Sequence, residues 1–259
     1  MQIINLKKED LKAMNELWNE VVTEDYFYKP LSFDEYQNKL LNNPDFSFDT
    51  VFGIKDNDKL VAYIIGYIRQ MYKDNLNVPG YVNMVVVKRE YRHQGIGSSL
   101  LKHLENYFKQ TGRKFVQASY YLPSCYSWYI PNTKNHDHPC APAIRINSNE
   151  YFFLLHRGYS IIGQEDAFHL DLSDYEISED IQKILDEAKK EGITIELYDK
   201  NKHYGLEEFY KELNIYDFEK VIRSNLELEH PYPFLVVAKD NKVDGWTGAM
   251  WNEESGRGH

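Results

Sequence analysis

One stretch of the chain, Val85–Leu101, constrains the fold more than any other. It reads as an apolar strand, a short basic turn and the start of an amphipathic helix. A helix N-terminus presents unpaired N–H groups and the positive end of the helix dipole. Glycines at Gly95 and Gly97 let a phosphate approach that backbone. The pattern therefore predicts a pyrophosphate site at Arg92–Ser98.

Three side chains in this turn strengthen the prediction. Arg92 and His93 add charge or hydrogen-bond donors, and Ser98 adds a hydroxyl. Competing phosphate loops fit less well, because a P-loop needs Gly-Lys-Ser/Thr and a dinucleotide fingerprint needs a third glycine where Leu100 stands. The remaining alternative is a strand-to-helix turn that binds no ligand.

The elements predicted around this stretch alternate between strands and helices, which is typical of an α/β fold. Tyr81–Val87 is apolar on both faces, as expected of a central strand. Ser32 is the expected N-cap of one helix, and Gly112 and Gly158 end two others. We expect strands over Ile3–Leu6, Phe46–Lys55, Lys59–Met71, Tyr81–Val87, Lys114–Tyr121 and Tyr159–Leu172, and helices over Glu9–Val22, Phe33–Leu41, Gly95–Lys109 and Ser148–Arg157.

The order strand, helix, helix, hairpin recurs after Gly192. The second set comprises a strand over Ile193–Leu197, helices over Leu206–Leu213 and Phe218–Leu228, and a hairpin over Phe234–Trp251. The turn words also match, since Lys55-Asp56-Asn57 and Lys239-Asp240-Asn241 each precede a strand. Recurrence at this spacing predicts duplicated domains, although Lys-Asp-Asn is also a common hairpin turn.

We therefore expect a first domain over 1–172, a linker helix over 173–192 and a partial second copy over 193–259. The second copy stops before any counterpart of Val85–Val87 or Arg92–Gly97. This suggests a truncated chain or a second copy that has decayed.

The central stretch resembles motif A of the GNAT superfamily of acyl-CoA N-acyltransferases, whose pattern is Arg/Gln-x-x-Gly-x-Gly/Ala after a buried strand. Arg92, Gly95 and Gly97 fill that pattern. The element order from Ile3 to Leu172 also resembles the GNAT fold, an α/β fold with a mixed sheet. The duplicated part is similar, more weakly, to bacterial tandem-GNAT proteins.

The resemblance implies which residues would bind acetyl-CoA. Val85, Val86 and Val87 would pair with the pantetheine arm, and one of their amides would polarise the thioester carbonyl. The pyrophosphate would be wrapped by His93, Gln94, Gly95, Ile96, Gly97 and Ser98, with Arg92 beside them. Asn147 matches the asparagine that leads a later helix in the family and lies near pantetheine; its alternative role is a plain N-cap.

The proton donor is where the chain departs from the family. Many members place a tyrosine four residues before the glycine that ends the later helix, and here that position is Leu154. Tyr151 lies one turn earlier and is the substitute candidate, or else an aromatic packing residue. Tyr120 and Tyr121, at the end of a strand beside the site, are candidates for lining the acceptor pocket.

Composition excludes several other classes. The net charge of −10 argues against a general nucleic-acid binder. No apolar run is long enough to span a bilayer, and the N-terminus lacks the layout of a signal peptide. With two cysteines, Cys125 and Cys140, a soluble cytoplasmic protein without a disulfide framework is expected.

The segment Leu122–Pro142 is long and is expected to be a surface loop next to the acceptor site. It contains Cys125, His136, His138 and Cys140, which are residue types that zinc prefers. Their spacing fits no standard zinc module, so no metal is expected and a substrate-shaping role is favoured.

These observations predict an acetyl-CoA-dependent N-acetyltransferase that acts on a primary amine, expected to be that of a small molecule. The alternative is a non-catalytic module that binds acyl-CoA as a sensor or structural partner. The expected partners are acetyl-CoA and the amine; nucleic acid and membrane are not expected, and an oligomer is possible.

Overall fold

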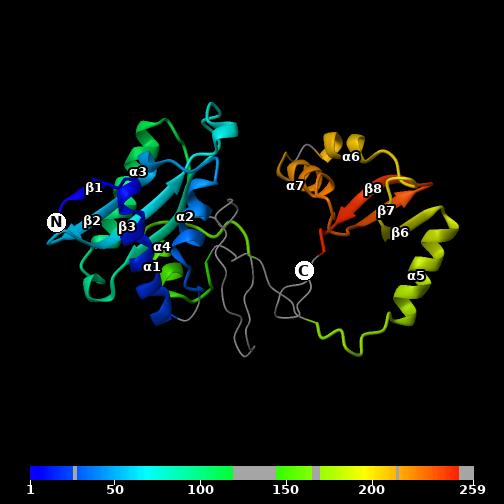
Figure 1. Ribbon diagram of the computed structural model, residues 1–259, viewed down its shortest axis with the longest axis horizontal. Helices are drawn as coiled ribbons and strands as arrows, with labels where there is room; N and C mark the ends of the chain where they lie inside the picture. Colours follow the sequence, from blue (N-terminus) through cyan, green and yellow to red (C-terminus); the bar gives the residue numbers. More distant parts are fainter. Residues whose placement is uncertain (26–27, 119–143, 165–169, 214–215, 251–259) are drawn as a thin grey trace. The chain divides into compact units, whose positions relative to one another are not determined.

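In the computed structural model, the described residues are 1–25, 28–118, 144–164, 170–213 and 216–250. The chain divides into two compact units, Met1–Asp166 (unit 1) and Ala167–His259 (unit 2), which are described separately below (Figure 1). Within the described ranges, no helix combines the length and the apolar character that crossing a bilayer would require.

Unit 1 is built on a five-stranded sheet in the order β1-β2-β3-β4-β5. Strands β1 to β4 are antiparallel to their neighbours, whereas β5 runs parallel to β4. The predicted α/β fold with a mixed sheet is therefore confirmed for this unit. The strands are β1 (Ile3–Asn5), β2 (Val51–Asp56), β3 (Lys59–Tyr67), β4 (Gly80–Val87) and β5 (Val116–Ala118).

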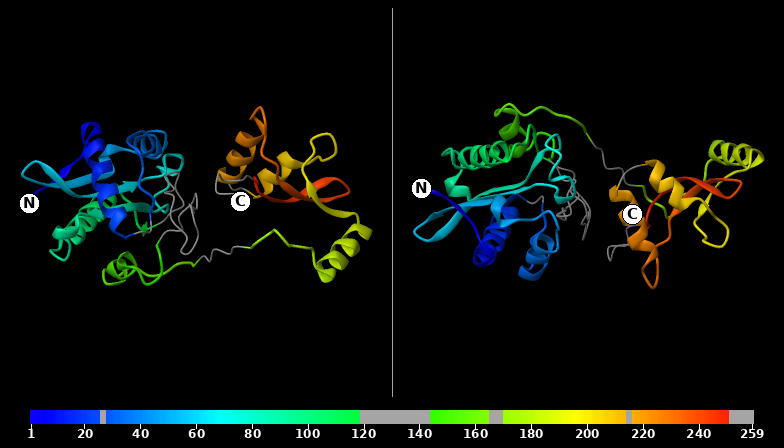
Figure 2. Two further views of the ribbon diagram at one scale, coloured as in Figure 1. Left: turned by 60° about the horizontal axis from the view of Figure 1, so that its bottom comes forward. Right: turned by 90° about the horizontal axis from the view of Figure 1, so that it is seen from above.

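Helices lie on both faces of this sheet. In the right-hand view of Figure 2, α3 lies on one side of the strands, and α1 and α2 lie on the other. Two separate clusters of buried apolar side chains fill the two interfaces. The helices are α1 (Leu11–Asp25), α2 (Phe33–Leu41), α3 (Ile96–Gln110) and α4 (Asn149–Leu155), with short 3-10 turns at Lys8–Asp10, Phe48–Thr50, Gln70–Tyr72 and Arg89–Tyr91.

Helix α2 begins at Ser32, as the sequence predicts. The Ser32 Oγ accepts a hydrogen bond from the Glu35 backbone N–H (3.3 Å), and the Glu35 carboxylate accepts one from the Ser32 backbone N–H (2.7 Å). This capping box satisfies two backbone donors at the helix start. The hydrogen bonds from Ser32 also lower the pKa of Glu35. Helix α2 thereby holds Tyr36 and Leu40 in the core.

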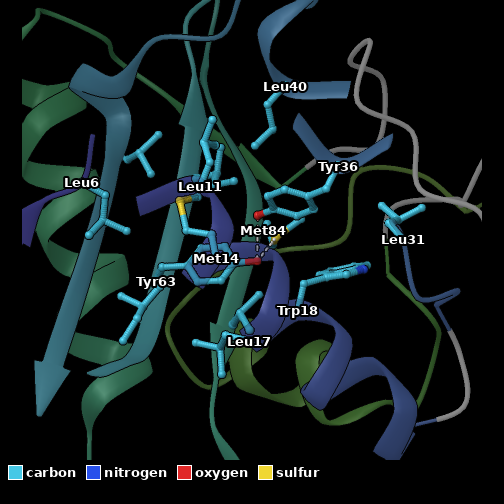
Figure 3. Close-up of a cluster of buried hydrophobic side chains, with 14 of the residues drawn as sticks. Leu6, Leu11, Met14, Leu17, Trp18, Leu31, Tyr36, Leu40, Tyr63 and Met84 are labelled. Atoms are coloured by element: carbon cyan, nitrogen blue, oxygen red, sulfur yellow. Dashed lines mark hydrogen bonds between the residues drawn. The ribbon is translucent and has the colours of Figure 1, made fainter. Parts of the chain in front are cut away.

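Two buried phenols connect α2 to the central strands. The Tyr36 Oη donates to the Tyr63 Oη (2.9 Å), and the Tyr63 Oη donates to the Met84 Sδ (3.1 Å). Figure 3 shows this chain within the apolar cluster between the sheet and helices α1 and α2. Because each buried hydroxyl donor has an acceptor, the polar atoms add little desolvation penalty and link α2 to β3 and β4.

Two predicted strands are longer than the strands observed. Regular pairing starts at Val51 rather than Phe46, and β3 ends at Tyr67 rather than Met71. Short 3-10 turns, Phe48–Thr50 and Gln70–Tyr72, occupy the excess. The first turn is favoured locally, because the Ser47 Oγ accepts a hydrogen bond from the Asp49 backbone N–H (3.1 Å).

The predicted strand over Tyr159–Leu172 is wrong across its described parts, 159–164 and 170–172, which form no strand. Its apolar side chains face solvent: Ile162 is 77% exposed and Leu170 is 66% exposed. A strand is stabilised by pairing and by side chains packed across the sheet, and Ile162 and Leu170 have neither in the described part of the chain. β propensity alone is a weak guide here.

Unit 2 contains a smaller antiparallel sheet in the order β6-β7-β8. Its core is one cluster that includes Leu206, Tyr210, Ile222, Phe234 and Val236. The predicted strand, two helices and hairpin are all present, with ends shifted by a few residues. The elements are α5 (Glu179–Lys190), β6 (Ile193–Leu197), α6 (Leu206–Leu213), α7 (Tyr216–Leu226), β7 (Leu235–Lys239) and β8 (Lys242–Thr247).

Candidate active site

Strand β4 has two neighbours over only part of its length. It pairs with β3 from Tyr81 to Val87, but its pairing with β5 covers only Gly80–Val82. Beyond Val82, the second edge of β4 has no partner among the described residues. Free N–H and C=O groups along such an edge can pair with an extended ligand.

Asn83 marks the point where this pairing ends. In the register of β3 with β4, Ile65 pairs with Met84 and Gly66 pairs with Val82, so Asn83 is an extra residue in a β-bulge. Its Oδ1 is buried and has no hydrogen-bond donor. The bulge redirects the following strand, so that Val86 packs toward the α1–α2 side while Val85 and Val87 pack toward α3.

The turn after β4 is tied back to the strands at two points. The Arg92 Nε donates to the Val87 carbonyl (3.0 Å), and the Tyr91 Oη donates to the Asp56 carboxylate (2.7 Å). That hydrogen bond to Asp56 raises the pKa of Tyr91. Arg92 thus anchors the turn as well as adding charge to it.

The rest of the basic turn is partly neutralised. Lys88 forms ion pairs with Glu20 (3.3 Å) and Glu90 (3.1 Å), and its hydrogen bonds to Glu90 and Glu20 raise the pKa of Lys88. The exposed Gln94 donates to the Glu90 carbonyl (2.8 Å), and the exposed His93 adopts a left-handed φ of 61°. His93 and Gln94 are thus the two exposed residues immediately before Gly95, the N-cap of α3.

Gly95 is the N-cap of α3, with φ 79°. The left-handed region is unfavourable for residues that carry a Cβ, which explains glycine at this position. No side chain caps this helix, and its first turn contains no acidic residue. A Cβ at Gly95 would meet nothing within 4 Å, so open space lies beside this residue at the start of the helix. Ile96, the first helical residue, points into the core and is buried.

Gly97 has a different role from Gly95. A Cβ at Gly97 would lie 3.3 Å from the Phe153 ring of α4. The sequence predicts that both glycines admit a phosphate, but the structure uses Gly97 to let α4 pack closely against the start of α3. Leu154 of the same helix is buried in the cluster beneath α3.

Arg157, just after α4, reaches the first turn of α3. Its Nε donates to the Ser98 Oγ (3.1 Å), its Nη2 also contacts that oxygen, and its Nη1 donates to the Phe153 carbonyl (2.8 Å). Its guanidinium carbon lies 3.8 Å from the centre of the Phe153 ring. Ser98 is thus held from a residue 59 positions away in sequence.

Helix α4 gives mixed support to the other predicted site residues. Tyr151 is half-buried one turn before Leu154, with its ring edge against Phe152 (5.2 Å between centroids). Asn147 is exposed with a left-handed φ of 64°. The N-cap alternative for Asn147 is wrong, because Ser148 is the N-cap and its Oγ accepts from the Tyr151 backbone N–H (3.2 Å).

Several predicted residues lie outside the described residues. These are the acceptor-pocket candidates Tyr120 and Tyr121, and the loop residues Cys125, His136, His138 and Cys140. Within the ranges that are described, no three His, Cys, Asp or Glu side chains form a group that could hold a metal ion.

Residues 11–125 match the family model described as "Acetyltransferase (GNAT) family", and they lie wholly within unit 1. This stretch of unit 1 is therefore similar to the GNAT acetyltransferase family. Members of that family are N-acetyltransferases that use acetyl-CoA. No curated protein matches the chain.

A solved structure supports the same fold. The glucosamine N-acetyltransferase region of a fungal multi-domain GH3 β-N-acetylglucosaminidase aligns with 95% of this chain at 17% identity and a TM-score of 0.58. The chain spans 26% of the length of that fungal protein. At this identity the likeness extends to the fold alone.

Two further structural neighbours are more distant. An aminoglycoside acetyltransferase from an uncultured soil metagenomic sample, in complex with sisomicin, covers 68% of this chain and 96% of its own (19% identity, TM-score 0.40). An N-acetyltransferase from Thermoplasma acidophilum, in complex with coenzyme A, covers 43% and 74% (21% identity, TM-score 0.33).

Sequence reasoning missed two residues of this site, Asn83 and Arg157. The bulge at Asn83 has no signal in a run of apolar strand residues. Arg157 is the last residue of the predicted helix Ser148–Arg157, but its contact with Ser98 depends on how α4 packs. Only the glycine at Gly97, read as space for a neighbouring helix, could have pointed to that contact.

Proposed function

We propose that unit 1 binds acetyl-CoA and transfers its acetyl group to a primary amine of a small molecule by direct attack. The observation that carries this proposal is the continuity of two ligand-binding features. After Val82, the second edge of β4 has no neighbour among the described residues, and the turn that follows Val87 leads to the start of α3 at Gly95, which no side chain caps. Together they suit a long, extended ligand with a phosphate at one end.

The pyrophosphate would lie at the start of α3. The backbone N–H groups of Ile96, Gly97 and Ser98 are helix donors without intrahelical acceptors, and the dipole favours an anion there. The open space above Gly95 fits a group that approaches the backbone itself. His93 and Gln94 complete the proposed wrap from the turn side, and Arg92 holds the turn in place.

The pantetheine arm would pair along Val85, Val86 and Val87 with the edge of β4 that has no neighbour in the described ranges. The amine nitrogen attacks the thioester carbonyl carbon, the C–N bond forms and the C–S bond breaks, and the thiolate takes up a proton. An amide N–H of this strand would stabilise the negative oxygen during the attack. Alignment of the two reactants supplies much of the rate, on the order of 7–11 kcal/mol.

The amine must lose a proton and the leaving thiolate must gain one. Leu154 is buried at the position where many family members have a tyrosine. Its aliphatic side chain has no proton to donate, so Leu154 cannot act as the acid. Tyr151 is our proposed donor because it lies on the same side of α4 one turn earlier. Asn147 is proposed to contact pantetheine, and Tyr120 and Tyr121 to line the acceptor pocket.

A non-catalytic acyl-CoA-binding module is the second candidate, and one observation favours it. Leu154 fills the tyrosine position with an apolar side chain only 9% exposed, which removes the usual proton donor while leaving the proposed cofactor site intact. Such a protein would bind acetyl-CoA without turnover.

We also propose that residues 193–259 are a partial second GNAT-like repeat, preceded by a linker helix within 173–192 and a first domain over 1–172. Each unit has a hairpin whose two turn residues adopt left-handed φ, Asn57 and Asp58 in one and Asp240 and Asn241 in the other. Counted from the turn, each hairpin also has a bulge after its second residue pair. A common turn word alone would not explain the shared bulge.

Calorimetric titration of the full chain with acetyl-CoA, followed by an acceptor screen, tests the proposal. We expect saturable binding and release of free thiol with at least one polyamine, aminoglycoside or amino sugar. Binding without thiol release from any amine would favour the sensor. Absence of acetyl-CoA binding would exclude both candidates.

A further inference from the structure

Arg157 has unused hydrogen-bonding capacity at the start of α3. A guanidinium carries five N–H groups, and the Arg157 contacts to Ser98 and Phe153 engage three of them. The side chain is exposed, so the remaining two are open to solvent. No carboxylate lies within 4.0 Å of this guanidinium in the described part of the chain.

The Arg157 guanidinium adds positive charge at the start of α3. The N-terminus of α3 carries a partial positive charge, and a cation beside it is repelled. Neither an acidic residue in the first turn nor a side-chain cap offsets this repulsion. Two features therefore meet at Ser98: a helix start that no side chain caps, and a guanidinium without a carboxylate partner among the described residues.

The Arg157 side chain is also held in place before any ligand binds. Its stacking on Phe153 (3.8 Å) and its hydrogen bonds to Ser98 and the Phe153 carbonyl restrict its rotamers. Phe153 is positioned in turn by its close contact with Gly97. A preorganised guanidinium loses less entropy on binding a phosphate than a free side chain would.

We propose that Arg157 is a phosphate-binding residue of the acetyl-CoA site. It bridges the Ser98 hydroxyl and a phosphate oxygen of the cosubstrate with its two free N–H groups. This inference rests on the proposed function. The phosphate can belong to the diphosphate or to the 3′-phosphomonoester, since both present the same oxygens to a guanidinium.

The test is calorimetric titration of the full-length wild type and variants with acetyl-CoA and with 3′-dephospho-CoA. We expect Arg157→Met to weaken acetyl-CoA binding by about 5- to 20-fold, the range for loss of a charge-assisted hydrogen-bonded contact at an exposed site. Arg157→Lys should recover part of the loss, because lysine keeps the charge but lacks the planar fork.

Lys109→Met is the matched control. This variant removes one exposed positive charge from the C-terminal end of α3. It therefore changes the net charge as much as Arg157→Met does, without altering the N-terminal end of α3. Its affinity for acetyl-CoA should stay within about twofold of wild type, because exposed charges this far apart are screened. Thermal unfolding of each variant establishes that it is folded.

Comparing acetyl-CoA with 3′-dephospho-CoA shows which phosphate Arg157 contacts. If the Arg157→Met loss disappears with 3′-dephospho-CoA, the residue contacts the 3′-phosphate; if the loss persists, it contacts the diphosphate. Equal binding of acetyl-CoA by wild type and folded Arg157→Met, or an equal loss in Lys109→Met, would overturn the inference. Failure of the wild type to bind either ligand would instead remove the proposed function.

Discussion

Units 1 and 2 arrange three antiparallel strands in the same way, but unit 1 buries both faces of these strands, whereas the described part of unit 2 buries mainly one. Measured from the hairpin turn, Ile54 of β2 and Val237 of β7 hold equivalent positions, and each is paired just before the bulge. Ile54 is 2% exposed in the cluster beneath α3. Val237 is only half-buried, and its neighbour on the paired strand, Ile195, is 51% exposed.

The opposite face shows the reverse relationship, because it is covered in both units. In unit 1, Leu60 and Tyr63 pack against α1 and α2; in unit 2, Val243 and Trp246 pack with residues of α6 and α7. Helix α3, which carries the proposed phosphate site, covers the face that contains Ile54 in unit 1 and has no counterpart in the described part of unit 2. The face packed against α1 and α2 in unit 1 is also covered in unit 2. The proposed phosphate site lies on the other side, where α3 covers the sheet of unit 1.

The largest expected difference is in stability. Ile54→Ala should destabilise unit 1 by about 3 kcal/mol, since it leaves a cavity in a closed core. Val237→Ala should cost unit 2 about 1 kcal/mol, because its side chain is already partly hydrated. Hydrogen exchange followed by mass spectrometry reads the two units separately through their own peptides. Similar losses in both units would mean that the second face of unit 2 is covered in solution.

The second prediction concerns two matched glycines. Gly95 precedes α3 with φ 79°, and Gly205 precedes α6 with φ 80°. Valine is strained in this region, so Gly95→Val should distort the start of α3 and weaken acetyl-CoA binding about 100-fold or more. Calorimetry measures the affinity.

Gly205→Val serves as the control, with the same backbone strain placed in unit 2. It should lower the unfolding temperature of unit 2 and leave acetyl-CoA affinity unchanged. An equal loss of affinity in both variants would show that binding requires unit 2, and an unchanged affinity in Gly95→Val would remove the proposed phosphate site.

Much of this comparison could be predicted from the sequence because it depends on local chemistry. The capping box at Ser32, the left-handed glycines at Gly95 and Gly112, and the turn residues at Asn57 and Asp240 each act within about four residues. Helix α3 was predicted for a related reason, since its apolar residues recur at helical spacing over fifteen residues.

The features that escaped prediction depend on contacts between distant segments. The strand predicted at Tyr159–Leu172 has the right side chains but no described neighbour to pair with. The bulge at Asn83 is set by the registry of β3 against β4, and the Arg157 contact by how α4 packs on α3. The shared Lys-Asp-Asn sequence also predicts one turn out of place. In unit 2 its Asp240 and Asn241 have left-handed φ, whereas in unit 1 the left-handed pair is Asn57 and Asp58, one residue later.

The smallest expected effect sharpens the comparison at Glu196, whose equivalent in unit 1 is the apolar Ile4. The hydrogen bond from Lys202, together with one from Thr194 (2.6 Å), lowers the pKa of Glu196 to about 2. A carboxyl group with a depressed folded-state pKa stabilises the protein above its unfolded pKa, near 4.5, and that stability is lost as the pH falls through 2.

After allowance for solvent screening, the contribution of Glu196 to unit 2 should be about 1 kcal/mol at pH 7. Urea unfolding of wild type and Glu196→Gln, compared between pH 7 and pH 2, should therefore show a stability difference that shrinks as the solution is acidified. Lys202→Met, which removes the main cause of the depressed pKa, should reduce the pH dependence similarly. A difference that stays constant with pH would mean that Glu196 stabilises unit 2 by packing, as Ile4 does in unit 1, rather than through its charge.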